Sequence, residues 1–182
     1  MAGTAVVFKS KYGATRKYAM YIAQRLDADM YDLAKVKKFD FGKYDTIVYG
    51  GGIYASSING IKFISSNAEK LEGKNILIFT TGLGDPAVAK NTQVISKSLN
   101  KVLPKQIMAN AHLYCFRGGI DYGKLSFLHK QMMSMMHKMI AKKSESEMTK
   151  DDRDILDTYG KAIDYVDVAT ASQLIEYVKG IK

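Results

Sequence analysis

Short hydrophobic runs alternate along the chain with segments of helical periodicity. Apolar runs predict strands at 6–8, 29–33, 46–49, 75–80 and 111–116. Apolar residues recurring at helical spacing predict helices at 15–26, 58–71, from Pro86 to about 103, 125–143 and 170–179. This repeated strand–helix alternation favours an α/β fold, with a doubly wound parallel sheet of five strands covered on both faces.

The segment at about 117–164 departs from this alternation. It contains the long predicted helix at 125–143, which has no proline or glycine, and an acidic, polar stretch at 145–157. We interpret the segment as a helical insertion after the fifth strand. The sequence has no internal repeats and no low-complexity linker, so we expect residues 1–182 to form a single domain.

Composition limits the compartments that fit this pattern. A single cysteine, Cys115, excludes an intrachain disulfide, which is typical of a reducing compartment. The chain enters its first strand without a signal-like segment, and its apolar runs fall short of the ~20 residues of a spanning helix. These features predict a cytoplasmic protein, with membrane association as an alternative that depends on the helix at 125–143.

The net charge of +9 raises the question of nucleic-acid binding. The lysines are spread over most of the chain, and no basic–aromatic module typical of RNA-binding sheets is visible. We therefore predict no nucleic-acid partner. A solvated basic surface fits the charge, and so does a surface that meets an anionic membrane or an acidic partner.

Three loops rich in glycine and hydroxyl side chains follow the first, third and fourth predicted strands, at 10–15, 50–57 and 80–85. In a doubly wound parallel sheet, ligands bind outside the carboxyl ends of the strands, at the switch point in strand order. We therefore expect the three loops to meet at one ligand site.

The first loop is a candidate phosphate site and consists of Ser10, Lys11, Tyr12, Gly13, Ala14 and Thr15. Free N–H groups in the first helical turn and the helix dipole favour an anion there, and the hydroxyls add neutral donors. The loop matches neither a Walker A motif nor a Gly-x-Gly-x-x-Gly fingerprint. A plain helix N-cap is the alternative interpretation.

The second and third loops are candidates for holding a flat ligand. The second loop contributes Gly51, Gly52, Ile53 and Tyr54, and the third contributes Thr81, Gly82, Leu83, Gly84 and Asp85. Glycines let the backbone approach a flat ring, and Ile53 and Tyr54 offer apolar and aromatic surface. The alternatives are a tight turn with an exposed tyrosine, and a strand–helix turn in which Asp85 caps the helix before Pro86.

On these three loops, the chain resembles the flavodoxin-like family over most of its length. The resemblance implies a sheet of order 2-1-3-4-5, non-covalent binding of FMN by the loop residues named above, and electron transfer as the function. The chain departs from electron-carrier flavodoxins in being basic where they are acidic. It also has Leu83 where they often place an aromatic residue, and it contains no tryptophan.

Within this family, the insertion is similar to that of the group that includes the menaquinone-dependent protoporphyrinogen dehydrogenases. The similarity covers the stretch from Phe116 to Tyr122 and the methionine-rich helix that follows it. It implies an alternative function, an oxidoreductase acting on protoporphyrinogen IX with a quinone acceptor. A redox partner protein or a quinone is thus the expected partner.

The helix at 125–143 carries an apolar stripe accompanied by lysines and by no acidic residue. The stripe consists of Leu125, Leu128, Met132, Met135, Met136 and Met139, widened by Met133 and Ile140. Methionine suits irregular apolar partners, and basic amphipathic helices lie on anionic membranes. Three interpretations remain open: core packing against the sheet, a pocket wall for an apolar ring system, and contact with an anionic membrane.

The remaining chemistry-bearing side chains predict neither a metal site nor a set of catalytic side chains. His129 and His137 are eight residues apart, too far for a helical metal pair at i, i+4. Together with His112, they are expected to be solvated or to cap backbone groups. Cys115 is expected to be a small buried strand residue.

Overall fold

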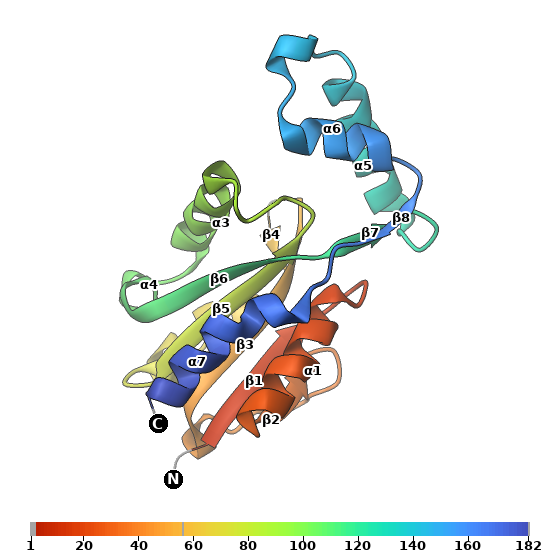
Figure 1. Cartoon of the computed structure of the whole chain (residues 1–182). Helices are drawn as coiled ribbons and strands as arrows, with labels where there is room; N and C mark the ends of the chain where they lie inside the picture. Colours follow the sequence, from red (N-terminus) through yellow and green to blue (C-terminus); the bar gives the residue numbers. More distant parts are fainter. Residues whose placement is uncertain (1–2, 56, 182) are drawn as a thin grey trace.

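A computed structural model describes residues 3–55 and 57–181 of the chain (Figure 1). Its central sheet is parallel, with the strand order β2-β1-β3-β5-β6. These strands are β1 Gly3–Lys9, β2 Asp29–Asp32, β3 Tyr44–Tyr54, β5 Asn75–Gly82 and β6 Ala111–Arg117. A short β4, Ser57–Ile58, pairs antiparallel with the end of β3. Counting the five parallel strands in sequence, the order is the predicted 2-1-3-4-5, and the α/β fold class is confirmed.

Helices cover both faces of the sheet. The α-helices are α1 Ala14–Leu26, α2 Lys62–Ser65, α3 Ala89–Val102, α4 Lys105–Asn110, α5 Phe127–Ile140, α6 Lys150–Thr158 and α7 Ser172–Gly180. Short 3-10 turns are η1 Phe41–Lys43, η2 Ala68–Leu71, η3 Glu145–Glu147 and η4 Val168–Ala171. Helices α1 and α7 lie side by side on one face (Figure 1).

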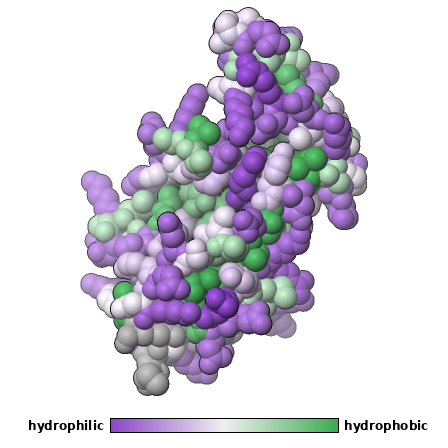
Figure 2. Space-filling view, in the orientation of Figure 1, coloured by the Kyte–Doolittle hydropathy of each residue, from purple (hydrophilic) through white to green (hydrophobic). Residues whose placement is uncertain are grey.

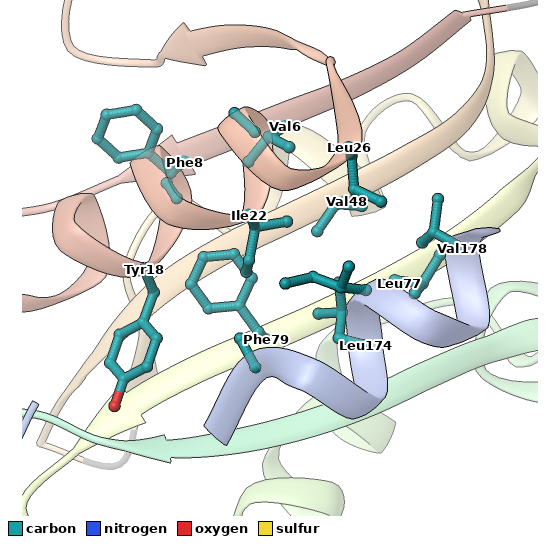
Figure 3. Packing of buried hydrophobic residues seen from close by; sticks show 14 of the residues in the cluster. Val6, Phe8, Tyr18, Ile22, Leu26, Val48, Leu77, Phe79, Leu174 and Val178 are labelled. Carbon is teal, nitrogen blue, oxygen red and sulfur yellow. The ribbon is translucent and has the colours of Figure 1, made fainter. Parts of the chain in front are cut away.

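Alternation along each strand sends successive side chains to opposite faces, so the sheet has two apolar cores. On the α1/α7 face, side chains of β1, β3 and β5 pack against both helices (Figure 3). The strands contribute Val6, Phe8, Val48, Leu77 and Phe79, and the helices contribute Tyr18, Ile22, Leu26, Leu174 and Val178. The opposite core includes Val7, Ile47, Tyr49, Ile78, Ile64, Leu71, Leu99 and Ile107. Burial on both faces explains why the strands read as continuous apolar runs.

The predicted end of the third strand and the predicted helix at 58–71 are both wrong. The third strand does not end at its glycines, because Gly50, Gly51 and Gly52 pair with β5 and the strand continues to Tyr54. The predicted helix at 58–71 is instead β4, α2 and η2, since Ile58 pairs with Ile53 in the sheet. Most of the predicted loop at 50–57 is therefore strand, and its residue 56 lies outside the described residues.

The insertion contains more secondary structure than its sequence predicted. Strands β7, Gly119–Asp121, and β8, Ala162–Asp164, form an antiparallel ribbon that leaves the carboxyl edge of the sheet. Helices α5 and α6 lie beyond this ribbon, away from the helices that cover the sheet (Figure 1). The polar stretch at 145–157 contains most of α6, which its composition did not suggest. Among the described residues, the helices all lack the length and apolar character needed to cross a membrane.

Asp152 holds the start of α6 and links it to the end of α5. Its carboxylate accepts a hydrogen bond from Lys143 Nζ at 2.8 Å and forms a capping box with Thr149. The hydrogen bond from Lys143, followed by the backbone N–H of Thr149, lowers the pKa of Asp152 to about 2. Because this pKa lies below the ordinary ~3.9, the interaction stabilises the fold above about pH 4, and the stabilisation is lost as the pH falls towards about 2.

We expect Asp152→Asn to destabilise the insertion by about 1–2 kcal/mol at neutral pH, since it removes the charge of a partly solvated ion pair and weakens the cap. Hydrogen exchange of the amides at 144–158 measures the effect. Asp157→Asn, at an exposed position of the same helix, is the control. Equal exchange in the two variants at pH 7 would contradict this assignment, and the difference should shrink as the pH falls towards 2 and vanish only below it.

Candidate functional site

A cleft opens at the carboxyl ends of β1, β3 and β5, between the sheet and α5. Its cavity volume is about 120 Å³. Seven predicted residues line it: Tyr12, Ala14, Ile53, Tyr54, Thr81, Gly82 and Leu83. The three predicted loops therefore come together at one edge of the sheet.

The first loop ends in an open helix N-terminus. Ser10 Oγ accepts a hydrogen bond from the N–H of Gly13 at 3.1 Å, and Gly13 adopts a φ of 102°, which suits glycine. The first hydrogen bond of α1 runs from Lys17 N–H to the Gly13 carbonyl at 3.1 Å. The N–H groups of residues 14–16 precede it and so have no partner within the helix. A Cβ at Gly13 would meet nothing within 4 Å, so this turn faces open space.

Thr15 fastens the first loop to the third. It is buried, and its hydroxyl lies 2.8 Å from the hydroxyl of Thr81. The third loop is in turn held to the end of β6, where Gly118 N–H donates to the Gly82 carbonyl at 2.7 Å. The floor of the cleft is formed where Gly118 approaches Ala14 and Gly82 closely. A Cβ at Gly118 would lie 3.4 Å from the Cβ of Ala14 and 3.5 Å from the Gly82 carbonyl oxygen.

Three rings gather at one side of the cleft. Tyr54 and His129 stack with centroids 5.3 Å apart and an interplanar angle of 24°, while Tyr12 meets Tyr54 edge-on at 5.6 Å. The Tyr12 hydroxyl lies 2.7 Å from His129 Nδ1 and accepts a hydrogen bond from the N–H of Ser126 at 3.3 Å. This cluster attaches the start of α5 to the first loop.

The protonation of this cluster follows from its surroundings. Burial raises the pKa of Tyr54, so its phenol stays protonated at neutral pH. Burial, together with the nearby positive charge of Lys11, lowers the pKa of His129, which keeps the imidazole neutral at pH 7. Burial raises the pKa of Tyr12, but hydrogen bonds with Ser126 and the charge of Lys11 outweigh it and leave that pKa lowered. Tyr54 and His129 thus present an uncharged aromatic surface to the cleft.

The glycines of the second loop are packed rather than free. A Cβ at Gly51 would lie 2.6 Å from Ile58 Cγ2, and one at Gly52 would lie 2.7 Å from the Tyr54 hydroxyl. Both glycines are buried in β3, while Ile53 and Tyr54 reach the cleft. The prediction that these glycines lie in a loop is wrong, because they belong to a strand whose close neighbours leave no room for side chains. Their contact with a cofactor stays a prediction.

The other predicted residues lie around the cleft rather than in its wall. Lys11 is exposed, and its Nζ is 3.5 Å from Ser126 Oγ. Gly84 packs beside Asn91. Asp85 accepts from the N–H of Ala87 at 3.0 Å and does not cap the helix, because α3 begins only at Ala89.

The insertion also fastens to the third loop. Arg117 donates to the Leu83 carbonyl at 3.3 Å, and its guanidinium lies 3.8 Å from the centre of the Tyr165 ring. Lys150 Nζ of α6 lies 3.7 Å from Asp85, and Asn91 donates to Asp151 at 2.5 Å. With the Tyr12 cluster at the other side, these contacts hold α5 and α6 over the cleft.

Eight lining residues were not among the predicted site residues: Ala55, Gly118, Gly119, Ile120, Leu125, His129, Met132 and Met133. His129 is not merely solvated or a cap, as expected, but is hydrogen-bonded inside the cleft. Its spacing from Leu125, Met132 and Met133 places all four on one helical face, and this signal was available in the sequence. Three interpretations of this helix were open: core packing, a pocket wall and membrane contact. The face with His129 fits a pocket wall, and the apolar stripe as a whole does not pack against the sheet.

The sequence matches the family model described as "Flavodoxin domain" over residues 5–147. No curated protein matches it. Solved structures of similar fold include a flavoprotein in complex with FMN from Lactobacillus acidophilus. It is 14% identical with a TM-score of 0.47, and the match covers 64% of this chain and 93% of that chain. Oxidised Flavodoxin 2 from Bacillus cereus is also 14% identical with a TM-score of 0.43, over 95% and 99% of the two chains.

The family match begins inside β1 and ends after α5, so it contains all three loops and the helix that walls the cleft. It extends over well more than half of the chain, and the parallel sheet has the strand order expected of the fold. The chain therefore belongs to the family of flavodoxin domains.

Proposed function

We propose that this chain binds FMN non-covalently and acts as a redox flavoprotein. The observation that supports this most is the make-up of the cleft, which combines an open helix N-terminus at Ser10–Thr15 with an apolar, aromatic wall. A dianionic phosphate suits the first feature, and a flat ring suits the second. Membership of the flavodoxin domain family supports the same cofactor.

The residues present fit the parts of FMN. Ser10, Gly13 and the N–H groups at the start of α1 would hold the phosphate with neutral donors, with Lys11 nearby as a counter-charge. Ile53, Tyr54 and Leu83 would enclose the ring between the second and third loops. Bound FMN would supply the electron transfer, in steps of one or two electrons.

The chain's own residues would set the conditions for that chemistry. Ile53, Leu83 and the helix α5 would limit the access of water to a bound ring, which would strengthen electrostatic interactions inside the cleft. The neutral rings of Tyr54 and His129 would place no charge beside the ring of reduced FMN. The net charge of +9 would favour anionic forms of FMN and would also favour acidic redox partners. Redox exchange with a partner protein needs no acid or base from the chain.

A second function is favoured by one observation, the wall that α5 adds beyond the three loops. Leu125, Met132 and Met133 extend the cleft with apolar surface that a simple electron carrier does not need. We infer as the alternative an oxidoreductase that oxidises protoporphyrinogen IX with a quinone acceptor. Quinone-dependent turnover by the FMN-loaded protein tests this alternative. Turnover that survives Leu125→Ser and Met132→Ser would contradict the role of the wall.

The proposed cofactor is tested by titrating the purified protein with FMN. We expect stoichiometric uptake, quenched flavin fluorescence and a shifted visible spectrum, because the ring would enter an apolar, aromatic site. Riboflavin, which lacks the phosphate, should bind at least about tenfold more weakly, a difference of about 1.4 kcal/mol. Equal affinity for the two flavins would contradict the role of the first loop, and no uptake of either would contradict the function.

A further inference from the structure

Helix α5 exposes large apolar side chains on the face that turns away from the cleft. Phe127 is 78% exposed, Leu128 66%, Met135 64% and Met139 65%. Among the large hydrophobic side chains that are exposed in the described part of the chain, these four have the highest exposed fractions. In the view of Figure 2, hydrophobic and hydrophilic residues are interspersed over the surface of the molecule.

Helical geometry places these four residues together. At about 100° per residue, they fall within roughly 120° of the helix circumference, which is one side of α5. The opposite side carries His129 and Met133, which line the cleft. Helix α5 therefore has two apolar faces, of which only one is covered by the rest of the chain.

Lysines lie on the same outer face. Lys138 is exposed and falls between the apolar side chains in helical projection, and Lys142, also exposed, follows in the turn just after the end of α5. No acidic residue occurs between Lys124 and Lys143, and the whole chain carries a net charge of +9. The outer face is thus both apolar and positively charged, a combination typical of helices that lie on anionic lipid.

We propose that the outer face of α5, defined by Phe127, Leu128, Met135 and Met139 with Lys138 and Lys142, docks on an anionic lipid bilayer. The apolar side chains enter the headgroup region, and the two lysines pair with lipid phosphates. The 14 residues of α5 extend about 21 Å, less than the ~30 Å hydrocarbon core, so the helix lies along the surface. Charge argues against a second copy as the occupant, because the same lysines would then face each other.

The absence of tryptophan from the chain allows a direct probe of this docking. Phe127→Trp places a single indole on the outer face. With vesicles of phosphatidylcholine and phosphatidylglycerol in equal amounts, at low salt, its emission should shift to the blue. Vesicles of phosphatidylcholine alone, or high salt, should abolish the shift. Val94→Trp, at a position 49% exposed on α3, is the control and should show no shift.

Co-sedimentation with the same anionic vesicles separates the two contributions. Leu128→Ser with Met135→Ser should lower the bound fraction at least about tenfold, and so should Lys138→Glu with Lys142→Glu. The matched controls are Met20→Ser with Val94→Ser, and Lys90→Glu with Lys97→Glu, at exposed positions outside the insertion. These controls should bind vesicles like the unchanged chain.

Several results would overturn the docking proposal. One is that the emission of Phe127→Trp shows no blue shift at low salt. Another is that the protein binds neutral and anionic vesicles equally, and a third is that the outer-face and control variants lose the same fraction of vesicle binding. A blue shift of Phe127→Trp that rises with protein concentration in the absence of lipid would assign the face to a second copy instead. Because the outer face does not line the cleft, FMN uptake should be unchanged in all of these variants, so failure of docking is distinguishable from failure of the proposed function.

Discussion

Replacement of Gly50 by alanine is expected to destabilise the protein by about 3 kcal/mol or more. A Cβ at this position would lie 2.1 Å from Cζ of Phe79 and 2.5 Å from its Cε1. The ring of Phe79 is fully buried and has the rings of Tyr18 and Phe116 beside it, at centroid distances of 6.5 and 5.7 Å. Gly50 itself is paired on both sides, so neither the ring nor the strand has room to move.

Urea unfolding followed by far-ultraviolet circular dichroism measures this loss. A second substitution, Phe79→Leu, should recover a large part of it, although alone it costs about 1–2 kcal/mol through the cavity that it leaves. Gly180→Ala is the matched control, because a Cβ there would meet nothing within 4 Å, and it should change stability by no more than about 1 kcal/mol. If Gly50→Ala keeps full stability but abolishes FMN uptake, this glycine serves ligand approach rather than packing.

The parallel sheet and the meeting of the three loops were predictable from local patterns in the sequence, whereas the strand order came from the resemblance to the flavodoxin-like family. Apolar runs such as 46–49 and 75–80 are typical of strands buried on both faces, and the chain between them is long enough for a crossover. Once the strands are parallel, their carboxyl ends share one edge, which places Tyr12, Tyr54 and Leu83 around one cleft whatever the details of the turns.

The glycine run was misread because its cause lies in the tertiary structure. Three successive glycines usually break a strand, but Gly50 faces the ring of Phe79 and Gly51 faces Ile58 and the Asn59 carbonyl. Phe79 is remote in the sequence, and Ile58 and Asn59 lie in or directly after β4, a strand that the sequence did not predict. No local pattern therefore reveals these neighbours. The same applies to 58–71, where pairing of Ile58 with Ile53 competes with its helical periodicity.

The insertion was located correctly, but its contribution to the cleft was not. Periodicity predicted a helix, and α5 lies within its predicted bounds at 125–143. Which face turns inward depends on contacts such as Tyr12 with His129 and Asp85 with Lys150, whose partners are more than sixty residues apart. The pairing of β7 with β8 likewise joins two three-residue segments that are too short to be recognised as strands.

Replacement of Ser10 by aspartate is expected to weaken FMN binding at least about hundredfold, or about 2.7 kcal/mol, without weakening the fold. Ser10 Oγ already accepts the Gly13 N–H at the start of α1, and a carboxylate accepts the same bond. Negative charge at a helix N-terminus contributes about 0.3–1 kcal/mol of stability. That charge would, however, lie beside the proposed position of the phosphate dianion and repel it.

The value of Ser10→Asp is that stability and cofactor affinity should change in opposite directions. Thermal unfolding without flavin should show the same or a higher Tm, while fluorescence titration should show the loss of FMN affinity. Ser10→Asn, which keeps the size and removes the charge, should bind FMN within about tenfold of the unchanged chain. Riboflavin affinity should be the same in both variants, because riboflavin has no phosphate to repel. If Ser10→Asp binds FMN as well as Ser10→Asn does, the turn at Gly13 holds no phosphate, and its open N–H groups are only the uncapped start of a helix.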